Sequence, residues 1–267
     1  MQKTILITGA GSGFGEAAAI RLAQEGHNVI ATVQCSPQVT PLRMKARELG
    51  LTSLQVEKLD LCDPHDMDFA QHFDVDVLWN NAGMGEGGPV FEIPIDLVRK
   101  NFEVNVFLPL ILTQAFVRKW INQKKQAKVV FTSSMSGLFS PVNWGVYAST
   151  KHALEAIAEA MQQELAGYGI KVQTINPGAF YTGFNETMAD TPFRWLSDEK
   201  HVTRRDELRA QFDEALASPF GHLDAQEMID RMVEIVPADT GKFRNVVPQA
   251  VEDMLRAHQQ GAWDNQI

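Results

Sequence analysis

Short β-branched runs alternate with longer amphipathic segments along this chain, and this alternation limits the possible folds more than any other feature. Strand candidates lie at residues 3–8, 28–33, 54–60, 75–80, 127–133 and 170–175, with a weaker one at 243–247. Helical patterns cover roughly residues 14–25, 38–49, 64–72, 95–124, 147–166 and 222–236. Such alternation, together with right-handed crossovers, favours parallel strands with helices on both faces. We therefore predict an α/β fold, a doubly wound, Rossmann-like parallel sheet of about seven strands.

Length and charge narrow the classes of protein further. The chain has 267 residues, of which 45% are hydrophobic, so it can bury a large core. It has no Ser/Gly/Pro-rich linker, charge block or internal repeat, so we expect one domain over residues 1–267. The net charge of -9 disfavours nucleic acid and anionic membranes as partners. The sequence shows no apolar run of the ~18 residues that a membrane span needs.

Cysteine usage and the start of the chain suggest a compartment. Cys35 and Cys62 lie in separate segments and lack metal-ligand spacing with each other or with histidine, so we expect free thiols and no metal site. The strand at 3–8 begins almost at Met1, which leaves no room for a signal peptide. A cytoplasmic protein is the expectation.

A glycine-rich turn joins the first predicted strand to the first helix. In Thr8-Gly9-Ala10-Gly11-Ser12-Gly13-Phe14-Gly15, Gly9, Gly13 and Gly15 match Thr-Gly-x-x-x-Gly-x-Gly. Glycine lets a backbone approach a pyrophosphate closely, and the helix that follows offers free N–H groups to the anion. Turns are often glycine-rich, but this position in a strand–turn–helix unit indicates a dinucleotide site.

Tyr147 and Lys151 stand four residues apart at the start of a helical pattern, so their side chains project from one face. Ser134 lies thirteen residues before the tyrosine, after the fifth strand. A nearby ammonium lowers the pKa of a phenol, which can then exchange a proton with a substrate oxygen. Taken alone, such a pair is usually a packed ring beside a solvated lysine.

Together these features resemble the short-chain dehydrogenase/reductase family, in its branch with Thr-Gly-x-x-x-Gly-x-Gly and Tyr-x-x-x-Lys motifs. The match runs in order over residues 3 to about 182. The resemblance implies that Tyr147 is the acid/base and that Ser134 polarises the substrate carbonyl. Lys151 would lower the pKa of Tyr147 and bind the nicotinamide ribose. Asn105 would hold a water that links Lys151 to solvent; otherwise it caps a bend in a long helix.

The same resemblance implies a nicotinamide cofactor, NAD(P)(H), and the residues that bind it. Asp60 would accept a bond from the adenine amino group, although such an aspartate is often only a turn or cap residue. Asn81 to Gly83 would border the adenine ribose and steady the sheet. The full set of expected cofactor contacts is Gly9, Ser12, Gly13, Phe14, Gly15, Gln34, Asp60, Leu61, Asn81, Ala82, Gly83, Tyr147, Lys151, Pro177, Gly178 and Thr182.

Two positions depart from the family pattern. Phe14 replaces the usual isoleucine or leucine, which we interpret as a packing variation. Val33 and Gln34 end the second strand, where NAD enzymes usually carry an acid and NADP enzymes a base. The 2'-phosphate of NADP without a cationic partner loses more binding energy than the ribose 2'-hydroxyl of NAD with a neutral partner. We therefore expect a weak preference for NAD(H). Arg43 or Lys45 would reverse it by reaching the phosphate.

Residues 183–241 are expected to form a lid over the substrate. The apolar residues of the lid are Phe184, Met188, Phe193, Trp195, Leu196, Phe212 and Phe220. Three more apolar residues, between Ser134 and Tyr147, would face the same cleft: Phe139, Val142 and Trp144. These residues could line an apolar substrate pocket, which is one interpretation. The other is that more than half of them simply pack against the lid helices. The lid length and Ala31-Thr32 resemble the steroid- and retinol-active branch of the family.

The predicted function is a dehydrogenase or reductase acting on a small-molecule alcohol or carbonyl. A non-catalytic dinucleotide sensor on the same fold is the alternative, but such proteins typically lose the tyrosine or lysine that this chain keeps. An epimerase or dehydratase is disfavoured by the glycine spacing. By resemblance, a homo-oligomer (dimer or tetramer) would pair through the helices at 95–124 and 147–166.

Overall fold

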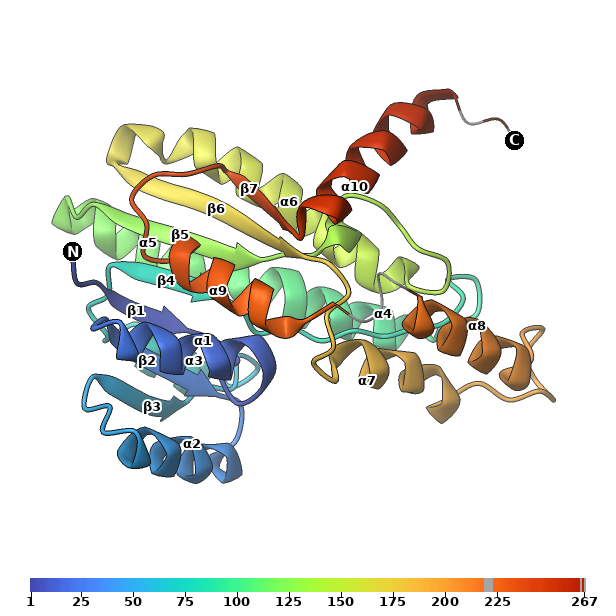
Figure 1. The fold of residues 1–267 in the computed structure, drawn as a ribbon, viewed down its shortest axis with the longest axis horizontal. Helices are drawn as coiled ribbons and strands as arrows, with labels where there is room; N and C mark the ends of the chain where they lie inside the picture. The colour runs from blue at the N-terminus through green and yellow to red at the C-terminus, as the bar shows by residue number, and fades with distance from the viewer. Residues whose placement is uncertain (219–222, 265, 267) are drawn as a thin grey trace.

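The computed structural model describes residues 1–218, 223–264 and 266 and contains a seven-stranded parallel sheet (Figure 1). The strand order is β3-β2-β1-β4-β5-β6-β7, so the chain starts in the middle and winds outward twice. The bounds are β1 Thr4–Ile7, β2 Asn28–Val33, β3 Leu54–Lys58, β4 Val77–Asn80, β5 Ala127–Thr132, β6 Ile170–Pro177 and β7 Arg244–Val247. The predicted doubly wound sheet is confirmed.

Ten α-helices lie within the described part of the chain. They are α1 Gly13–Gln24, α2 Ser36–Glu48, α3 Pro64–Ala70, α4 Ile95–Phe102, α5 Leu108–Gln123, α6 Gly145–Glu164, α7 Phe184–Asp190, α8 Arg205–Ala217, α9 Ala225–Ile235 and α10 Gln249–Gly261. Helices α7, α8 and α10 were not among the predicted segments. The helix predicted from residue 222 begins at Ala225, with Asp224 as its N-cap, and residue 222 itself lies outside the described residues.

Alternating side chains divide the core into two layers. Along β1, Ile5 and Ile7 pack on one face of the sheet with α1, α2 and α9, whereas Leu6 packs on the other face with α3, α5 and α6. Successive residues of a strand point to opposite faces, and both faces here are covered by helices. This explains why the strands read as continuous apolar runs rather than as alternating patterns.

The helix predicted over residues 95–124 is interrupted by a π-helix, Glu103–Phe107, between α4 and α5. The segment Ile95–Gln123 has the length and hydropathy of a membrane span, but half of its most apolar window is buried inside the fold. It is therefore a core helix, and its apolar character reflects packing on the sheet.

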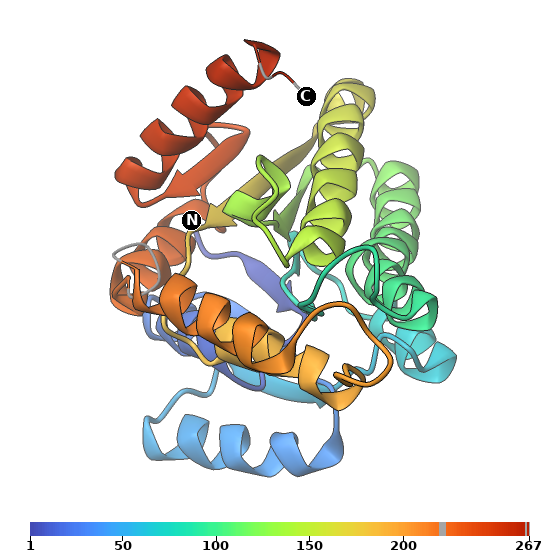
Figure 2. The same ribbon diagram turned by 90° about the vertical axis from the view of Figure 1, so that its right-hand side faces the viewer.

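All strands point their carboxyl ends toward the same edge of the sheet, beside α7 and α8 (Figures 1 and 2). Asn81, just after β4, ties this edge together. Its Nδ2 donates to the carbonyls of Thr8 and Gly9 at 3.1 and 3.2 Å, and its Oδ1 accepts from Thr132 Oγ1 at 3.1 Å. The ends of β1, β4 and β5 are thereby held in register where the predicted site residues lie.

Candidate active site

The structure brings Tyr147 and Ser134 together at this edge. Tyr147 lies in the first turn of α6, and Ser134 follows β5 at the start of the short 3-10 helix Met135–Gly137. Both residues are buried, and the Ser134 hydroxyl hydrogen-bonds the Tyr147 phenol. Ser134 Oγ also accepts from Ser136 N at 3.0 Å, which fixes the serine rotamer. The two hydroxyls can therefore contact one substrate oxygen together.

Lys151 lies one helical turn beyond Tyr147 and is also buried. Its Nζ is 5.6 Å from the centroid of the Tyr147 ring and donates to the Thr132 carbonyl at 2.8 Å. A Cβ added to Gly83 would stand 3.7 Å from Lys151 Nζ and 3.4 Å from Asn105 Oδ1. Lys151 and Asn105 thus converge on the loop after β4, with the Tyr147 ring beside Lys151.

The pKa of Tyr147 departs from the prediction. Burial raises it to about 12, and the hydrogen bond from Ser134 opposes this rise. In this structure the effect of burial on Tyr147 exceeds any lowering by Lys151. Burial also lowers the pKa of the Lys151 ammonium to about 8, against the charge of Glu155, which raises it. At neutral pH the phenol keeps its proton, which is the form that donates to a carbonyl oxygen.

Asn105 lies in the π-helix and is buried. Its Oδ1 accepts from Met84 N at 2.8 Å, and its Nδ2 donates to Met84 O at 2.7 Å and to Thr150 Oγ1 at 3.0 Å. Single π-turns inside long helices are frequent at functional sites. Here the π-turn presents the Asn105 amide to the Met84 backbone, so it anchors the loop next to Lys151 through a bend in the long helix.

The glycine-rich turn forms a cradle that side chains would fill. Gly9 has φ +69, and a Cβ there would stand 2.7 Å from Ala82 Cα. A Cβ on Gly15 would stand 2.4 Å from Gly9 O and 2.6 Å from Asn81 Nδ2. Helix α1 begins directly after Ser12 and directs its free N–H groups and positive dipole end into this turn. The cradle fits the diphosphate of a dinucleotide.

A Gly15→Ala substitution is expected to weaken NADH binding at least tenfold and to cost roughly 1–3 kcal/mol of unfolding free energy, because the methyl group overlaps backbone atoms. Fluorescence titration with NADH and urea denaturation measure the two effects. Gly167→Ala is the matched control, since a Cβ there meets nothing within 4 Å. Unchanged NADH binding by Gly15→Ala would show that this turn is not the anion site.

The remaining glycine-turn residues are placed as follows. Ser12 and Gly13 are exposed, and Gly13 has φ +57. A Cβ on Gly13 would lie 3.9 Å from Thr182 Cβ, so the segment after β6 approaches the turn. Phe14 packs edge-on against Phe180 with ring centroids 5.6 Å apart. The Phe14 ring therefore serves to pack against Phe180.

The neighbouring loops carry the other expected contacts. Asp60 Oδ1 accepts from Cys62 N at 3.0 Å, which is a local turn. The Leu61 side chain is buried in the core, which leaves its backbone for a ligand. Gln34 is exposed after β2. On the β6 side, Gly178 N donates to Val247 O at 2.8 Å, and Pro177 ends β6 in register with Val247.

The two cations that would reverse the cofactor preference are engaged elsewhere. Arg43 donates to Val56 O at 2.7 and 3.2 Å and lies 3.7 Å from Glu57. Lys45 is paired with Glu16 at 2.9 Å. Gln38, which was not predicted, reaches the glycine turn instead, because a Cβ on Gly11 would stand 2.7 Å from Gln38 Nε2.

Most of the predicted lid residues pack within the lid. Leu196 and Phe212 are buried in one cluster, and Trp144, Phe193 and Trp195 pack against it. Phe184 instead lies over Tyr147, with ring centroids 5.6 Å apart. Met188 is buried against the glycines at positions 85 and 87. Phe220 lies outside the described residues.

Two residues expected to face the substrate do not form an apolar pocket wall. Phe139 packs against the cluster of Met135, Val251 and Leu255 and contacts His258 on α10 edge-on. Val142 is 81% exposed. The prediction for Phe139 is wrong because α10, which the sequence pattern did not reveal, covers this side of the loop.

Sequence reasoning also missed three supporting residues. Thr132 accepts the Lys151 bond through its carbonyl, and Thr150 accepts from Asn105. Glu155 is buried one turn beyond Lys151. The i, i+4 spacing of Lys151 and Glu155 was the one available signal. Among the described residues, no group of three or more His, Cys, Asp or Glu is arranged to hold a metal ion.

Comparison with known proteins adds independent evidence. The model of the family described as short chain dehydrogenase matches residues 3–192. The chain is 33% identical over 186 residues to 1-deoxy-11-beta-hydroxypentalenate dehydrogenase of Streptomyces exfoliatus, covering 66% of each chain. It is 33% identical over 190 residues to human retinol dehydrogenase 8, covering 68% of this chain and 60% of that protein. The chain thus matches less than two thirds of the length of each of these two relatives.

A solved structure supports the same fold over nearly the whole chain. A short chain dehydrogenase/reductase from Burkholderia phymatum in complex with NAD superposes with a TM-score of 0.81 at 23% sequence identity. The alignment covers 98% of this chain and 94% of that one. The family match extends over well over half of the sequence and includes Ser134, Tyr147, Lys151 and the glycine turn. The chain belongs to the short-chain dehydrogenase/reductase family of oxidoreductases.

Proposed function

We propose that this protein is an NAD(P)-dependent oxidoreductase that interconverts an alcohol and a carbonyl group, with Tyr147 as the acid/base. The cofactor supplies the hydride exchange when it is bound. Tyr147 passes its phenolic proton to the substrate oxygen, and Ser134 holds that oxygen by a second hydrogen bond. Lys151 binds the nicotinamide ribose and favours the phenolate that forms as Tyr147 gives up its proton. Asn105 fixes the loop beside Lys151.

One observation carries this proposal: the hydrogen-bonded Ser134 and Tyr147, with Lys151 and Asn105 beside them, lie at the same sheet edge as the glycine cradle. Ligands bind at this edge in doubly wound sheets. A dinucleotide sensor needs the cradle and a lysine for the ribose, but it has no use for serine and tyrosine hydroxyls placed together for one substrate oxygen. The retained set of polar side chains therefore favours catalysis over sensing.

The cofactor preference is proposed to be NAD(H). Gln34 offers a neutral partner to a ribose hydroxyl, and the cations of Arg43 and Lys45 are bound to other groups. We expect kcat/KM with NADH to exceed that with NADPH, and Gln34→Arg to shift the ratio toward NADPH by supplying a cation. Steady-state rates with both cofactors measure the ratio. A tenfold preference of the unmodified protein for NADPH would contradict this proposal.

The substrate is proposed to approach between Phe184 and the loop before Tyr147, under a lid at residues 183–241 of a single domain. Phe184 offers an aromatic surface next to the Tyr147 phenol, so the lid favours a substrate with apolar surface. The direct test is a nicotinamide absorbance screen with ketones and aldehydes from small polar to steroid-sized, and the matching alcohols in reverse. Silence across the panel despite NADH binding would favour the sensor.

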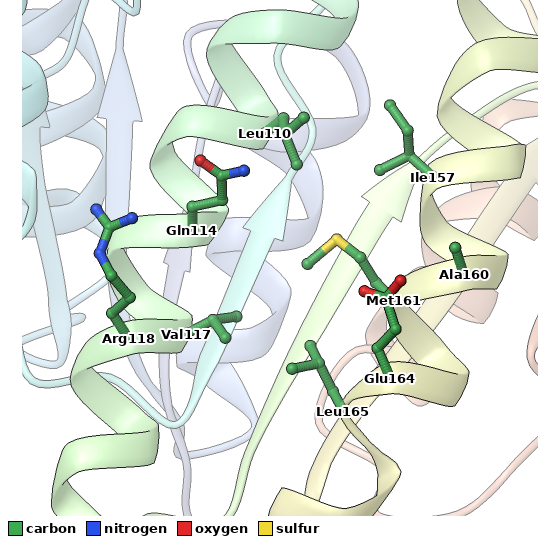
Figure 3. A pocket seen from close by; sticks show the side chains of 9 residues that line it. All are labelled: Leu110, Gln114, Val117, Arg118, Ile157, Ala160, Met161, Glu164 and Leu165. Atoms are coloured by element: carbon green, nitrogen blue, oxygen red, sulfur yellow. The ribbon is translucent and has the colours of Figure 1, made fainter.

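We further propose that the protein is cytoplasmic, since Cys35 and Cys62 are free and exposed. We also propose that it forms a homo-oligomer. Helices α5 and α6 leave a groove between them (Figure 3), lined by Leu110, Gln114, Val117, Arg118, Ile157, Ala160, Met161, Glu164 and Leu165. Ile111 and Phe107 on the same long helix are about half exposed. A second copy would cover this apolar face.

Placing a charge in the groove is expected to dissociate the oligomer. Ala160→Arg puts a long side chain into the groove, where it would overlap a second copy packed on this face. Sedimentation velocity should show a smaller species for Ala160→Arg. Gln163→Arg, also exposed on α6 but outside the groove, is the control and should not change the sedimentation coefficient. Equal behaviour of the two variants would place the interface elsewhere.

A further inference from the structure

Glu155 is a buried carboxylate whose position links the proposed catalytic groups. It lies on α6 one turn beyond Lys151 and is 4% exposed. Its Oε1 accepts from Asn176 Nδ2 at 2.6 Å, and its Oε2 accepts from Arg244 Nε at 2.9 Å. Burial of a carboxylate is costly unless both oxygens are satisfied, as they are here. A residue kept at this cost has a task that an apolar side chain cannot perform.

Asn176 extends the contact from Glu155 to Ser134. Its Nδ2 also donates to the Ser134 carbonyl at 3.2 Å, and its Oδ1 accepts from Thr174 Oγ1 at 3.0 Å. The amide is thus held at both ends, and its orientation fixes the backbone that carries the Ser134 hydroxyl. A displacement of Glu155 would be passed to Ser134 through this single side chain.

Arg244 supplies the opposite charge from the edge of the sheet. It lies on β7, its side chain is 36% exposed, and it also stands 3.6 Å from the exposed Glu159. Both Glu155 oxygens are thus engaged by Asn176 and Arg244, whereas Lys151, one turn earlier on the same helix face, donates to the Thr132 carbonyl. Among the described residues, the titratable groups on α6 that face Lys151 are Tyr147 and Glu155. The other elements contribute the uncharged Thr132 carbonyl, the Gly83 loop and Asn105.

We propose that Glu155 is a positioning residue for the dehydrogenase reaction: its carboxylate supports the charge of the Lys151 ammonium and, through Asn176, holds the Ser134 backbone. The inference rests on the roles proposed above for Lys151 and Ser134. The negative charge also raises the pKa of Lys151 against the effect of burial, which agrees with the geometry. Arg244, which pairs with the Glu155 carboxylate, partly neutralises its charge and so weakens its effect on Lys151.

The test compares Glu155→Gln with Glu159→Gln. Glutamine at 155 keeps an acceptor for Asn176 but removes the charge and turns an NH2 group toward Arg244. The control loses a carboxylate on the same helix that contacts the same arginine. NADH binding is titrated by fluorescence from pH 5.5 to 9.5, with urea denaturation in parallel. We expect the upper pH midpoint for binding to fall by about one unit in Glu155→Gln, and Glu159→Gln to match the unmodified protein.

Arg244→Gln keeps the inference testable if Glu155→Gln does not fold. Removing this partly exposed cation leaves the charge of Glu155 without its neutralising partner, so the midpoint is expected to move upward, opposite to Glu155→Gln. Midpoints that stay fixed in every folded variant, with only a loss of stability, would overturn the inference. Lys151→Met separates the two proposals: if it leaves the pH profile unchanged, Lys151 is not the titrating group and the inference about Glu155 fails, whereas turnover in the absorbance screen tests the proposed function independently.

Discussion

Replacing Tyr147 with phenylalanine is expected to lower kcat by about 10²–10⁴-fold and to leave the fold and NADH binding largely intact. The variant keeps the ring that packs on Phe184, 5.6 Å between centroids, and removes only the hydroxyl that bonds Ser134. Loss of one buried hydrogen bond costs about 1 kcal/mol, so the protein should remain folded. Nicotinamide absorbance measures turnover, and fluorescence titration measures NADH binding.

The control for this prediction is Tyr168→Phe. Tyr168 is 57% exposed and lies in the short 3-10 helix after α6, so the same chemical change occurs far from Ser134. Tyr168→Phe should retain full turnover. If Tyr147→Phe turns over substrate at nearly the rate of the unmodified protein, the acid/base assignment of Tyr147 is contradicted. A combined loss of turnover and folding would instead assign Tyr147 a structural role.

The sheet and the position of the site followed from the sequence because both depend on local patterns. β-Branched runs separated by amphipathic segments have one favourable parallel arrangement, and its carboxyl edge gathers whatever follows the strands. Gly9, Asn81, Ser134 and Gly178 each follow a strand, so their meeting at this edge needed no knowledge of side-chain contacts. The four-residue spacing of Tyr147 and Lys151 likewise fixed one helix face.

Features that depend on long-range contacts were not predictable from local patterns. The π-turn at Asn105 pairs with the Met84 backbone, which is distant in sequence. The orientation of Phe139 depends on α10, which lies more than one hundred residues later. The raised pKa of Tyr147 depends on how deeply the ring is buried, and spacing to Lys151 carries no information about depth.

The role of the apolar lid residues could not be predicted from local sequence patterns either. Leu208 and Phe212 of α8 are buried with Ala189 of α7 and with Leu196 between the two helices, so these apolar residues form a small local cluster separate from the main core. Aromatic residues in a lid therefore do not by themselves indicate a substrate pocket. Among the lid residues that the structure describes, Phe184 connects the lid to the reactive groups through its contact with the Tyr147 ring.

Replacing Lys151 with methionine is expected to reduce turnover by at least about 10²-fold and to weaken NADH binding about tenfold, without loss of stability. Burial lowers the pKa of Lys151 from 10.5 to about 8, so below pH 8 the folded protein bears the full cost of the buried charge. That shift corresponds to roughly 3 kcal/mol. Methionine has a similar length and removes this cost, although the Thr132 carbonyl loses its donor.

The sign of the stability effect follows from the lowered pKa. Between about pH 8 and 10.5 the folded protein releases the Lys151 proton before the unfolded chain does, so the cost of the charge falls as pH rises. Urea denaturation should therefore show Lys151→Met equal to or more stable than the unmodified protein at pH 7, with any gain shrinking by pH 9.5. The exposed Lys200→Met is the control and should change neither stability nor turnover. If Lys151→Met loses stability together with activity, the lysine supports the fold, and a catalytic task is not needed to explain its burial.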